Sequence, residues 1–121
     1  MNTKEINLPE EAQLLRIFVG DGDKHHHQPL YEALVLKARE MHLAGATVFK
    51  SAMGYGPNSR LHTAKILQLS TDLPILIEIV DTREKIDSFL PVLDEMMDGG
   101  LVTIEPVRVI HYRSHNGKSK P

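Results

Sequence analysis

Apolar residues along this chain follow two different periods, and the alternation between them predicts the order of its secondary structure elements. Residues 14–20, LLRIFVG, and residues 74–80, PILIEIV, are short apolar runs rich in branched residues, a composition typical of strands. The segments 46–53, ATVFKSAM, and 101–113, LVTIEPVRVIHYR, are interpreted as two further strands. Pro106 in the last of these indicates a bulge or a sheet edge.

Two segments between these runs repeat their apolar residues with the period of an amphipathic helix. The first begins near Pro29, a residue suited to a first helical turn, and Gly45 is its expected stop. Its apolar face holds Leu30, Leu34, Ala38 and Met41. The second begins at Asp81, which has capping-box spacing to Glu84, and ends at the glycines of residues 98–100. Its apolar face holds Ile86, Phe89, Leu90, Leu93 and Met97.

The predicted order βαββαβ is that of an α+β ferredoxin-like sandwich, in which four antiparallel strands carry two helices on one face. Alternation puts Leu15, Ile17 and Val19 on one side of the first strand and Leu14 and Phe18 on the other. The third strand is apolar on both sides apart from Glu78. Because two helices cover only one face, the other apolar face needs a partner, and self-association is the simplest solution. The alternative is that the leader or the tail folds across this face.

Length and composition limit the remaining choices. With 121 residues the chain accommodates one domain, at residues 14–113, with a flexible leader (1–13) and a flexible tail (114–121). The net charge of −2 gives no reason to expect nucleic-acid binding. The absence of cysteine excludes disulfides and thiolate chemistry and is compatible with a cytoplasmic location. No stretch has the apolar length of a signal peptide core or a membrane span.

The connection between the second and third strands, residues 54–73, is much longer than a hairpin needs, and such length is typical of functional loops. Gly54 and Gly56 flank Tyr55 and allow backbone amides to approach an anion or a base. The structural alternative is a bulge at the end of the strand. His62 is the histidine that we retain as a candidate ligand contact.

A second glycine pair follows Asp98, at Gly99 and Gly100, where the alternative is an ordinary helix C-cap. In an oligomer of this fold, this turn and the long connection of a neighbour can meet at a subunit cleft. Three arginines could bring guanidinium groups to a phosphate there, although each taken alone fits a solvated surface position. They are Arg60, Arg108 and Arg113.

The run His25-His26-His27 is internal and precedes the first helix. Neighbouring residues of an extended loop point in different directions, so a solvated loop is favoured over a metal site. No nucleophile elbow, Walker loop, zincin motif or pair of carboxylates on convergent elements is present in the sequence. We therefore expect a protein that is not an enzyme.

Three stretches, read together, carry a resemblance to a known family: GDGDKHHHQPLYEALVLKAREMHLAGATVFK, GYGPNSRLHTAKILQLSTDLPILIEIVD and DGGLVTIEPVRVIHYR. PLYEALV, AGATV, the Gly-x-Gly with Ser-x-x-His-Thr and LPILIEIVD occur in the right order with the right spacing. From Leu14 to Arg113 the chain resembles the PII-like family catalogued as domain of unknown function 190. The resemblance implies a ferredoxin-like homotrimer related to the PII signalling proteins. The 54–73 connection stands where those proteins carry their mobile effector-contacting loop.

The resemblance also implies a site. In PII proteins an adenine nucleotide lies between subunits against a Gly-aromatic-Gly turn, which residues 54–56 match, and against an Asp-Gly turn, which Asp98 and Gly99 match. The chain departs from the pattern at Gly100, where PII proteins have Lys, and the late basic pair appears only as His111 and Arg113. The missing Lys removes one expected phosphate contact, and a ligand with fewer phosphates, or none, would need less positive charge.

These observations predict a PII-like signal-transduction protein that binds a small ligand, an adenine nucleotide by resemblance, at subunit clefts and requires no cofactor. It would act through its long loop on a partner, and the family's link to small membrane ion exporters makes a transporter or ion channel one such partner. Two alternatives stay open. One is a divalent-metal-binding protein of the cation-tolerance type, with His25, His26 and His27 as ligands. The other is a structural adaptor without a ligand.

Overall fold

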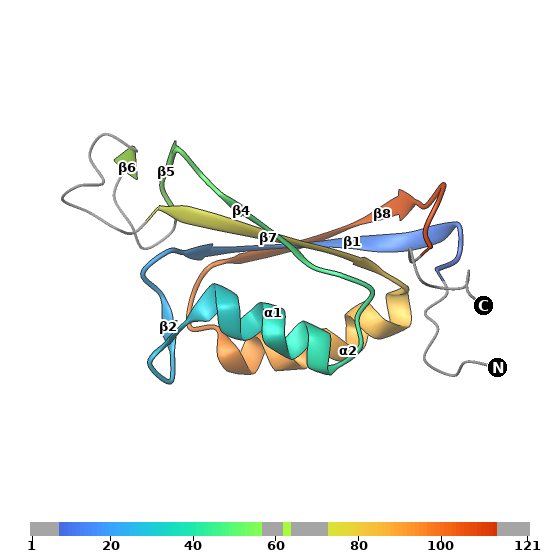
Figure 1. Cartoon of the computed structure of the whole chain (residues 1–121), viewed down its shortest axis with the longest axis horizontal. Helices are drawn as coiled ribbons and strands as arrows, with labels where there is room; N and C mark the ends of the chain where they lie inside the picture. Colours follow the sequence, from blue (N-terminus) through green and yellow to red (C-terminus); the bar gives the residue numbers. More distant parts are fainter. Residues whose placement is uncertain (1–7, 57–61, 64–72, 114–121) are drawn as a thin grey trace.

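The structure, a computed structural model, describes residues 8–56, 62–63 and 73–113, with residues 62–63 described by their backbone only. Its main body is a four-stranded sheet with both helices, α1 and α2, on one face (Figure 1). The elements along the chain are β1 (Glu11–Gly20), β2 (Lys24–His25), β3 (Gln28–Pro29), α1 (Leu30–Glu40), β4 (Thr47–Lys50), β5 (Met53–Gly54), β6 (His62–Thr63), β7 (Pro74–Asp81), α2 (Arg83–Met96) and β8 (Leu101–Arg108).

The sheet has the order β4-β7-β1-β8, and every neighbouring pair is antiparallel. This confirms the predicted ferredoxin-like arrangement, with the two middle strands contributed by β1 and β7. β8 is an edge strand, so Pro106 occupies the position that a residue without a backbone N–H tolerates. β1 begins three residues earlier than the apolar run indicates, and Ala12 in this extension is buried.

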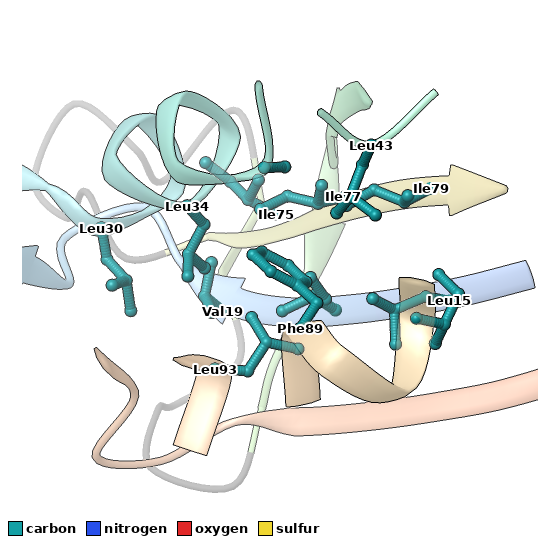
Figure 2. Packing of buried hydrophobic residues seen from close by; sticks show 13 residues of the cluster. Leu15, Val19, Leu30, Leu34, Leu43, Ile75, Ile77, Ile79, Phe89 and Leu93 are labelled. Carbon is teal, nitrogen blue, oxygen red and sulfur yellow. The ribbon is translucent and has the colours of Figure 1, made fainter. Parts of the chain in front are cut away.

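The hydrophobic core lies between the helices and the face of the sheet that they cover (Figure 2). Leu15 and Ile17 of β1 are fully buried and pair across the sheet with Ile79 and Ile77 of β7. Phe89 of α2 packs into the same cluster and is fully buried. Strand residues two apart share one face, so the alternation seen in the sequence selects these side chains for the core.

α1 ends earlier than the sequence indicates, because His42 and not Gly45 terminates it. His42 has a φ of 64°, the left-handed conformation usual after the last helical residue. Its N–H is donated to the Arg39 carbonyl at 3.0 Å, and the N–H of Leu43 is donated to the Ala38 carbonyl at 3.0 Å. These two bonds define a Schellman motif formed without glycine.

Replacing His42 with glycine is expected to raise the free energy of unfolding by roughly 0.5–1 kcal/mol, because glycine adopts a positive φ without steric cost. Urea denaturation monitored by circular dichroism would measure the change. His42→Ala is the matched control and should give no such gain, since alanine keeps the Cβ. Equal stabilisation by both substitutions would contradict the explanation.

α2 follows the predicted helix closely but is capped one residue later than expected. Its N-cap is Thr82, whose hydroxyl accepts a hydrogen bond from the Lys85 N–H at 3.1 Å, and Glu84 therefore takes no part in a capping box. Pro91 lies inside the helix, where it removes one backbone hydrogen bond. The helix continues past it because Ile86, Phe89 and Leu93 are buried on one face.

In the part of the chain that the structure describes, no helix covers the other face of the sheet, which is called the open face here. It carries the alternate residues of each strand, among them Phe18 of β1, Phe49 of β4 and Leu101 of β8. Phe49 and Leu101 are 48% and 50% exposed. The apolar surface predicted opposite the helices is therefore present. Within the described ranges, no helix is long and apolar enough to cross a membrane.

Candidate functional site

The two glycine turns singled out in the sequence lie at the same end of the sheet, called the glycine end here. Gly54 pairs with His62 in the short β5–β6 ladder, and a Cβ built on Gly54 would lie 3.2 Å from Cγ of Pro74, at the start of β7. Pro74 pairs with Gly20, the last residue of β1. Tyr55 is 69% exposed.

Gly100, on the other turn, lies against β1 near the same end. A Cβ on Gly100 would be 2.5 Å from the Phe18 carbonyl oxygen and 2.9 Å from Cε of Met97, and its φ is 118°. Gly100 therefore permits a close approach of two backbones that a side chain would prevent. α2 ends at Met96 and its C-cap is Met97, which is extended, so the glycines at 99 and 100 do not cap the helix. Asp98, Gly99 and Gly100 line a cavity of about 450 Å³ between α2 and β8.

The candidate basic residues lie at the opposite end of the sheet, called the basic end. Arg108, the last residue of β8, pairs with Glu11 in the ladder, and its Nε donates to a carboxylate oxygen of Glu10 at 2.5 Å. Beyond β8, Nη2 of Arg113 lies 3.2 Å from Nδ1 of His111. Figure 1 shows the start of β1 and the end of β8 together at this end, away from β5 and β6.

A cavity of about 560 Å³ lies at the basic end, where the segment after β8 passes over the open face. The Tyr112 hydroxyl donates to the Ala44 carbonyl at 3.2 Å, which ties this segment to the loop before β4. The wall combines apolar side chains with a carboxylate and backbone groups, as ligand pockets commonly do. Its lining includes Ala44, Thr47, Glu78, Val80, Arg108 and His111.

A charged cluster stands in the middle of the open face. Arg16 of β1 donates from Nε to Glu78 of β7 at 3.0 Å and from Nη1 to Glu105 of β8 at 3.2 Å. The hydrogen bond to Glu78 is the largest of the effects that raise the pKa of the Arg16 guanidinium above its ordinary value. Since Glu78 also lines the cavity, Arg16 fixes the orientation of an acidic group in the cavity wall.

The glycine end and the basic end are well separated within one chain. Gly100 contacts Phe18, whereas Arg108 pairs with Glu11, seven residues earlier on β1. At 3.2–3.4 Å per strand residue this is a separation of about 23 Å. Gly100 and Arg108 of one chain are therefore too far apart for one nucleotide to contact both.

The histidine run forms the tip of a small hairpin. β2 and β3 pair with His25 opposite Gln28, and His26 and His27 form the two-residue turn with φ of 52° and 70°. Two successive positive φ angles are typical of a type I′ turn. The rings of His25 and His26 are 4.2 Å apart. Among the residues that the structure describes, no group of three or more His, Asp or Glu side chains is placed to hold a metal ion.

Sequence reasoning found part of this arrangement. Arg60 lies outside the described residues, as does most of the 54–73 connection, and only the backbone of His62 is described. Reasoning from the sequence missed Ala44, Tyr112 and the bridging role of Arg16. Glu78 is recognisable in the sequence, because it is the one charged residue of the apolar run 74–80. The contacts of Arg16 join residues 62 and 89 positions apart, a separation that local patterns do not reveal.

Two solved structures that share this arrangement of strands and helices are PII-like proteins. A putative PII-like signaling protein from Thermus thermophilus superimposes with a TM-score of 0.61 at 19% identity, over 83% of this chain and 90% of that one. CPII from Thiomonas intermedia, a nitrogen regulatory PII-like protein solved with ADP, AMP and bicarbonate, gives 0.56 at 16% identity, over 82% and 88%. The chain therefore has a PII-like ferredoxin-like fold.

Sequence comparison identifies the family within that class. The chain belongs to the DUF190 family, described as "Uncharacterized ACR", whose model matches residues 12–109. A UPF0166 protein from Aquifex aeolicus is 39% identical over 101 residues, which are 84% of this chain and 95% of the relative. A UPF0166 protein from Methanocaldococcus jannaschii is 34% identical over 100 residues, 82% of this chain and 92% of the relative. The resemblance noted in the sequence is thus confirmed.

Proposed function

We propose that this protein is a non-catalytic, cytoplasmic regulatory protein that binds an adenine-nucleotide-type ligand between two copies of the chain. The observation that carries the proposal is the separation of the candidate residues into the glycine end and the basic end. Each end borders its own cavity, and Gly100 and Arg108 of one chain are too far apart for one small ligand to contact both. In a ring of copies, the basic end of one chain and the glycine end of its neighbour form one complete site.

The open face supports the proposed assembly. Phe18, Phe49 and Leu101 lie on the open face, and the side chains of Phe49 and Leu101 are exposed there. Closed symmetry is the usual way in which a soluble protein hides such a surface, and a cyclic trimer is the assembly implied by the resemblance to PII proteins.

Two further observations favour a nucleotide ligand. The cavity at the basic end combines apolar walls, formed in part by Val80 and Val107, with the fixed carboxylate of Glu78, which can accept a hydrogen bond from an amino group. A nucleobase is bound by a surface that combines apolar groups with a hydrogen-bond acceptor. Arg113, beside His111 at the same end, carries donors for a phosphate. CPII, of the same fold, was solved with ADP and AMP bound.

The output of the protein is proposed to run through residues 54–73. The β5–β6 ladder places the start of this connection at the glycine end, so a ligand bound there would contact its base. A change in the order of the connection would then report the ligand to a partner. The partner suggested by the family resemblance is a membrane transporter or ion channel.

A complementation experiment tests the shared site. Arg113→Gln weakens the basic end and Tyr55→Ala the glycine end, so each variant alone should lose most AMP binding in isothermal titration calorimetry. When the two are unfolded together and refolded as mixed oligomers, about a quarter of the sites combine two intact ends and should regain wild-type affinity. Native mass spectrometry would establish the oligomeric state and the mixing.

Separate refolding of each variant is the control. A site contained in one chain predicts no recovery in the mixed sample, which would overturn the shared arrangement. If wild-type protein binds neither AMP, ADP nor ATP at millimolar concentration, the nucleotide proposal itself is wrong.

A further inference from the structure

Among the strands that the structure describes, none pairs with the outer side of the edge strand β8. The pairing of β8 with β1 shows which backbone groups face outward. One step beyond the last pair of this ladder, the N–H of Val109 is donated to the Glu10 carbonyl at 2.6 Å. Hydrogen-bonded pairs alternate along an antiparallel ladder, so Thr103 is bonded to β1 whereas Val102 and Ile104 are not. The N–H and C=O groups of Val102 and Ile104 therefore point toward the outer edge of the sheet.

The side chains of the same two residues are apolar and exposed. Ile104 lies opposite Leu15 and Val102 lies opposite Ile17, so both side chains are on the face of the sheet that carries the helices. They are nevertheless 40% and 37% exposed, so α2 leaves them partly uncovered. Natural edge strands are commonly protected by charged residues, bulges or a covering element. Residues 101–104 carry no charge, and this part of the edge is open to an added strand.

The cavity of about 450 Å³ between α2 and β8 lies beside this part of the edge. Its apolar wall includes Leu90, Met97 and Val102. Its charged groups are the carboxylates of Asp94 and Asp98, two exposed residues at the C-terminal end of α2, where the helix dipole also favours a cation. No basic side chain is among the described residues that line the cavity. The cavity is therefore complementary to a segment that carries apolar and basic side chains together.

We infer that the outer edge of β8 and this cavity form a docking site for an extended peptide segment of a partner protein. Residues two apart in an added strand share one face, so apolar side chains at such positions pack on Val102 and Ile104. A lysine or arginine next in the same row pairs with Asp94 or Asp98. Backbone pairing supplies affinity, and the side-chain contacts select the sequence. The inference goes beyond the proposed function, because docking at this edge requires no nucleotide.

The heptapeptide Lys-Thr-Val-Thr-Val-Thr-Lys, with both ends blocked, tests the inference. Its valines and lysines share one face, and it reads the same in both directions, so it suits a parallel or an antiparallel pairing. We expect a Kd below about 1 mM by isothermal titration calorimetry. The peptide with glutamate in place of both lysines should bind at least about threefold more weakly at low ionic strength.

Hydrogen exchange of single amides, measured by NMR, shows where the peptide binds. The outward amides of Val102 and Ile104 should exchange at least about fivefold more slowly with the lysine peptide bound, because they become hydrogen-bonded. The amide of Thr103 is bonded to β1 in the free protein and should change little. Slower exchange of Thr103 alone would contradict the proposed pairing.

Two pairs of variants separate the backbone contact from the charge contact. Ile104→Pro removes an outward N–H and leaves the pairing with β1 intact, as Pro106 does two residues later. It should bind the lysine peptide about fivefold more weakly than Ile104→Ala, which keeps the donor. Asp98→Asn should weaken the lysine peptide about threefold, whereas Glu32→Gln, at an exposed position of α1, should not. Urea denaturation verifies the folding of each variant.

The inference is wrong if the folded protein does not bind the lysine peptide at millimolar concentration, or if the lysine and glutamate peptides bind equally. It is also wrong if native mass spectrometry shows that the peptide or Ile104→Pro reduces the oligomeric state, because the edge would then be a contact between copies. If Ile104→Pro does not fold, the exchange of the wild-type amides and the Asp98 variant decide the question. AMP is absent from all these measurements, so failure of the nucleotide proposal would leave this inference standing.

Discussion

Gly100→Ala is expected to lower the free energy of unfolding by roughly 2–4 kcal/mol, a large effect for the addition of one methyl group. The new Cβ would lie 2.5 Å from the Phe18 carbonyl oxygen, and the φ of 118° is unfavourable for any residue with a side chain. β8 would have to move away from β1 to relieve the contact. Chemical denaturation with urea measures the loss.

Gly45→Ala is the matched control for this substitution. No heavy atom lies within 4 Å of a Cβ at Gly45, so its stability should stay within about 0.5 kcal/mol of wild type. Gly100→Lys should destabilise at least as much as Gly100→Ala, because any Cβ at this position meets the same carbonyl oxygen. Wild-type stability of Gly100→Ala would show that the close approach of β1 and β8 is not required.

Asp81→Ala should cost about 2–4 kcal/mol of unfolding free energy, because it leaves two backbone donors without a partner. The Asp81 side chain is buried, and its two oxygens accept from the Ala44 N–H at 2.8 Å and from the Thr82 N–H at 2.7 Å. Asp81→Asn keeps one acceptor oxygen but turns a donor toward the other N–H, so it should also destabilise.

Asp87→Ala, on the exposed surface of α2, provides the comparison for the loss of a carboxylate alone. It should change the stability by no more than about 0.5 kcal/mol. If Asp81→Ala were as mild as Asp87→Ala, the two hydrogen bonds would contribute little and the end of β7 would be held by packing alone.

Most of the fold could be predicted from the sequence, because the spacing of apolar residues indicates both the type of each element and the side of it that is buried. Spacing alone puts Leu15 and Ile17 on one side of the first strand and Phe89 on the apolar face of the second helix, and the structure buries all three residues. In α2 the helical spacing of the apolar residues predicts a helix despite Pro91. The helix forms because tertiary packing supplies most of the stability of a helix in a protein.

The sequence predictions that are wrong concern the residues at which helices begin and end, because the conformation of a single residue decides where a helix stops. Gly45 is the more typical helix terminator, yet His42 adopts the left-handed conformation and ends α1. Asp81 has the spacing of an N-cap, yet its carboxylate bonds to the Ala44 N–H across the fold, and Thr82 caps α2 in its place. Local sequence cannot show that a distant backbone donor competes for a side chain.

The candidate site was predictable only as a set of separate residues. Glycine turns and arginines are recognisable in a sequence, but their distribution over two ends of a sheet depends on the strand register. Arg16 shows the same limitation, because its partners Glu78 and Glu105 come from strands on either side of β1.

Ala44 has a consequence for how variants of this protein will be interpreted. Its N–H is donated to Asp81 beside the hydrophobic core, and its carbonyl accepts from the Tyr112 hydroxyl over the cavity. The backbone of Ala44 therefore connects the wall of the cavity to the core through these two hydrogen bonds. A genetic screen for loss of ligand response should therefore recover substitutions at Asp81 together with those in the cavity, and only a stability measurement on each variant would separate the two groups.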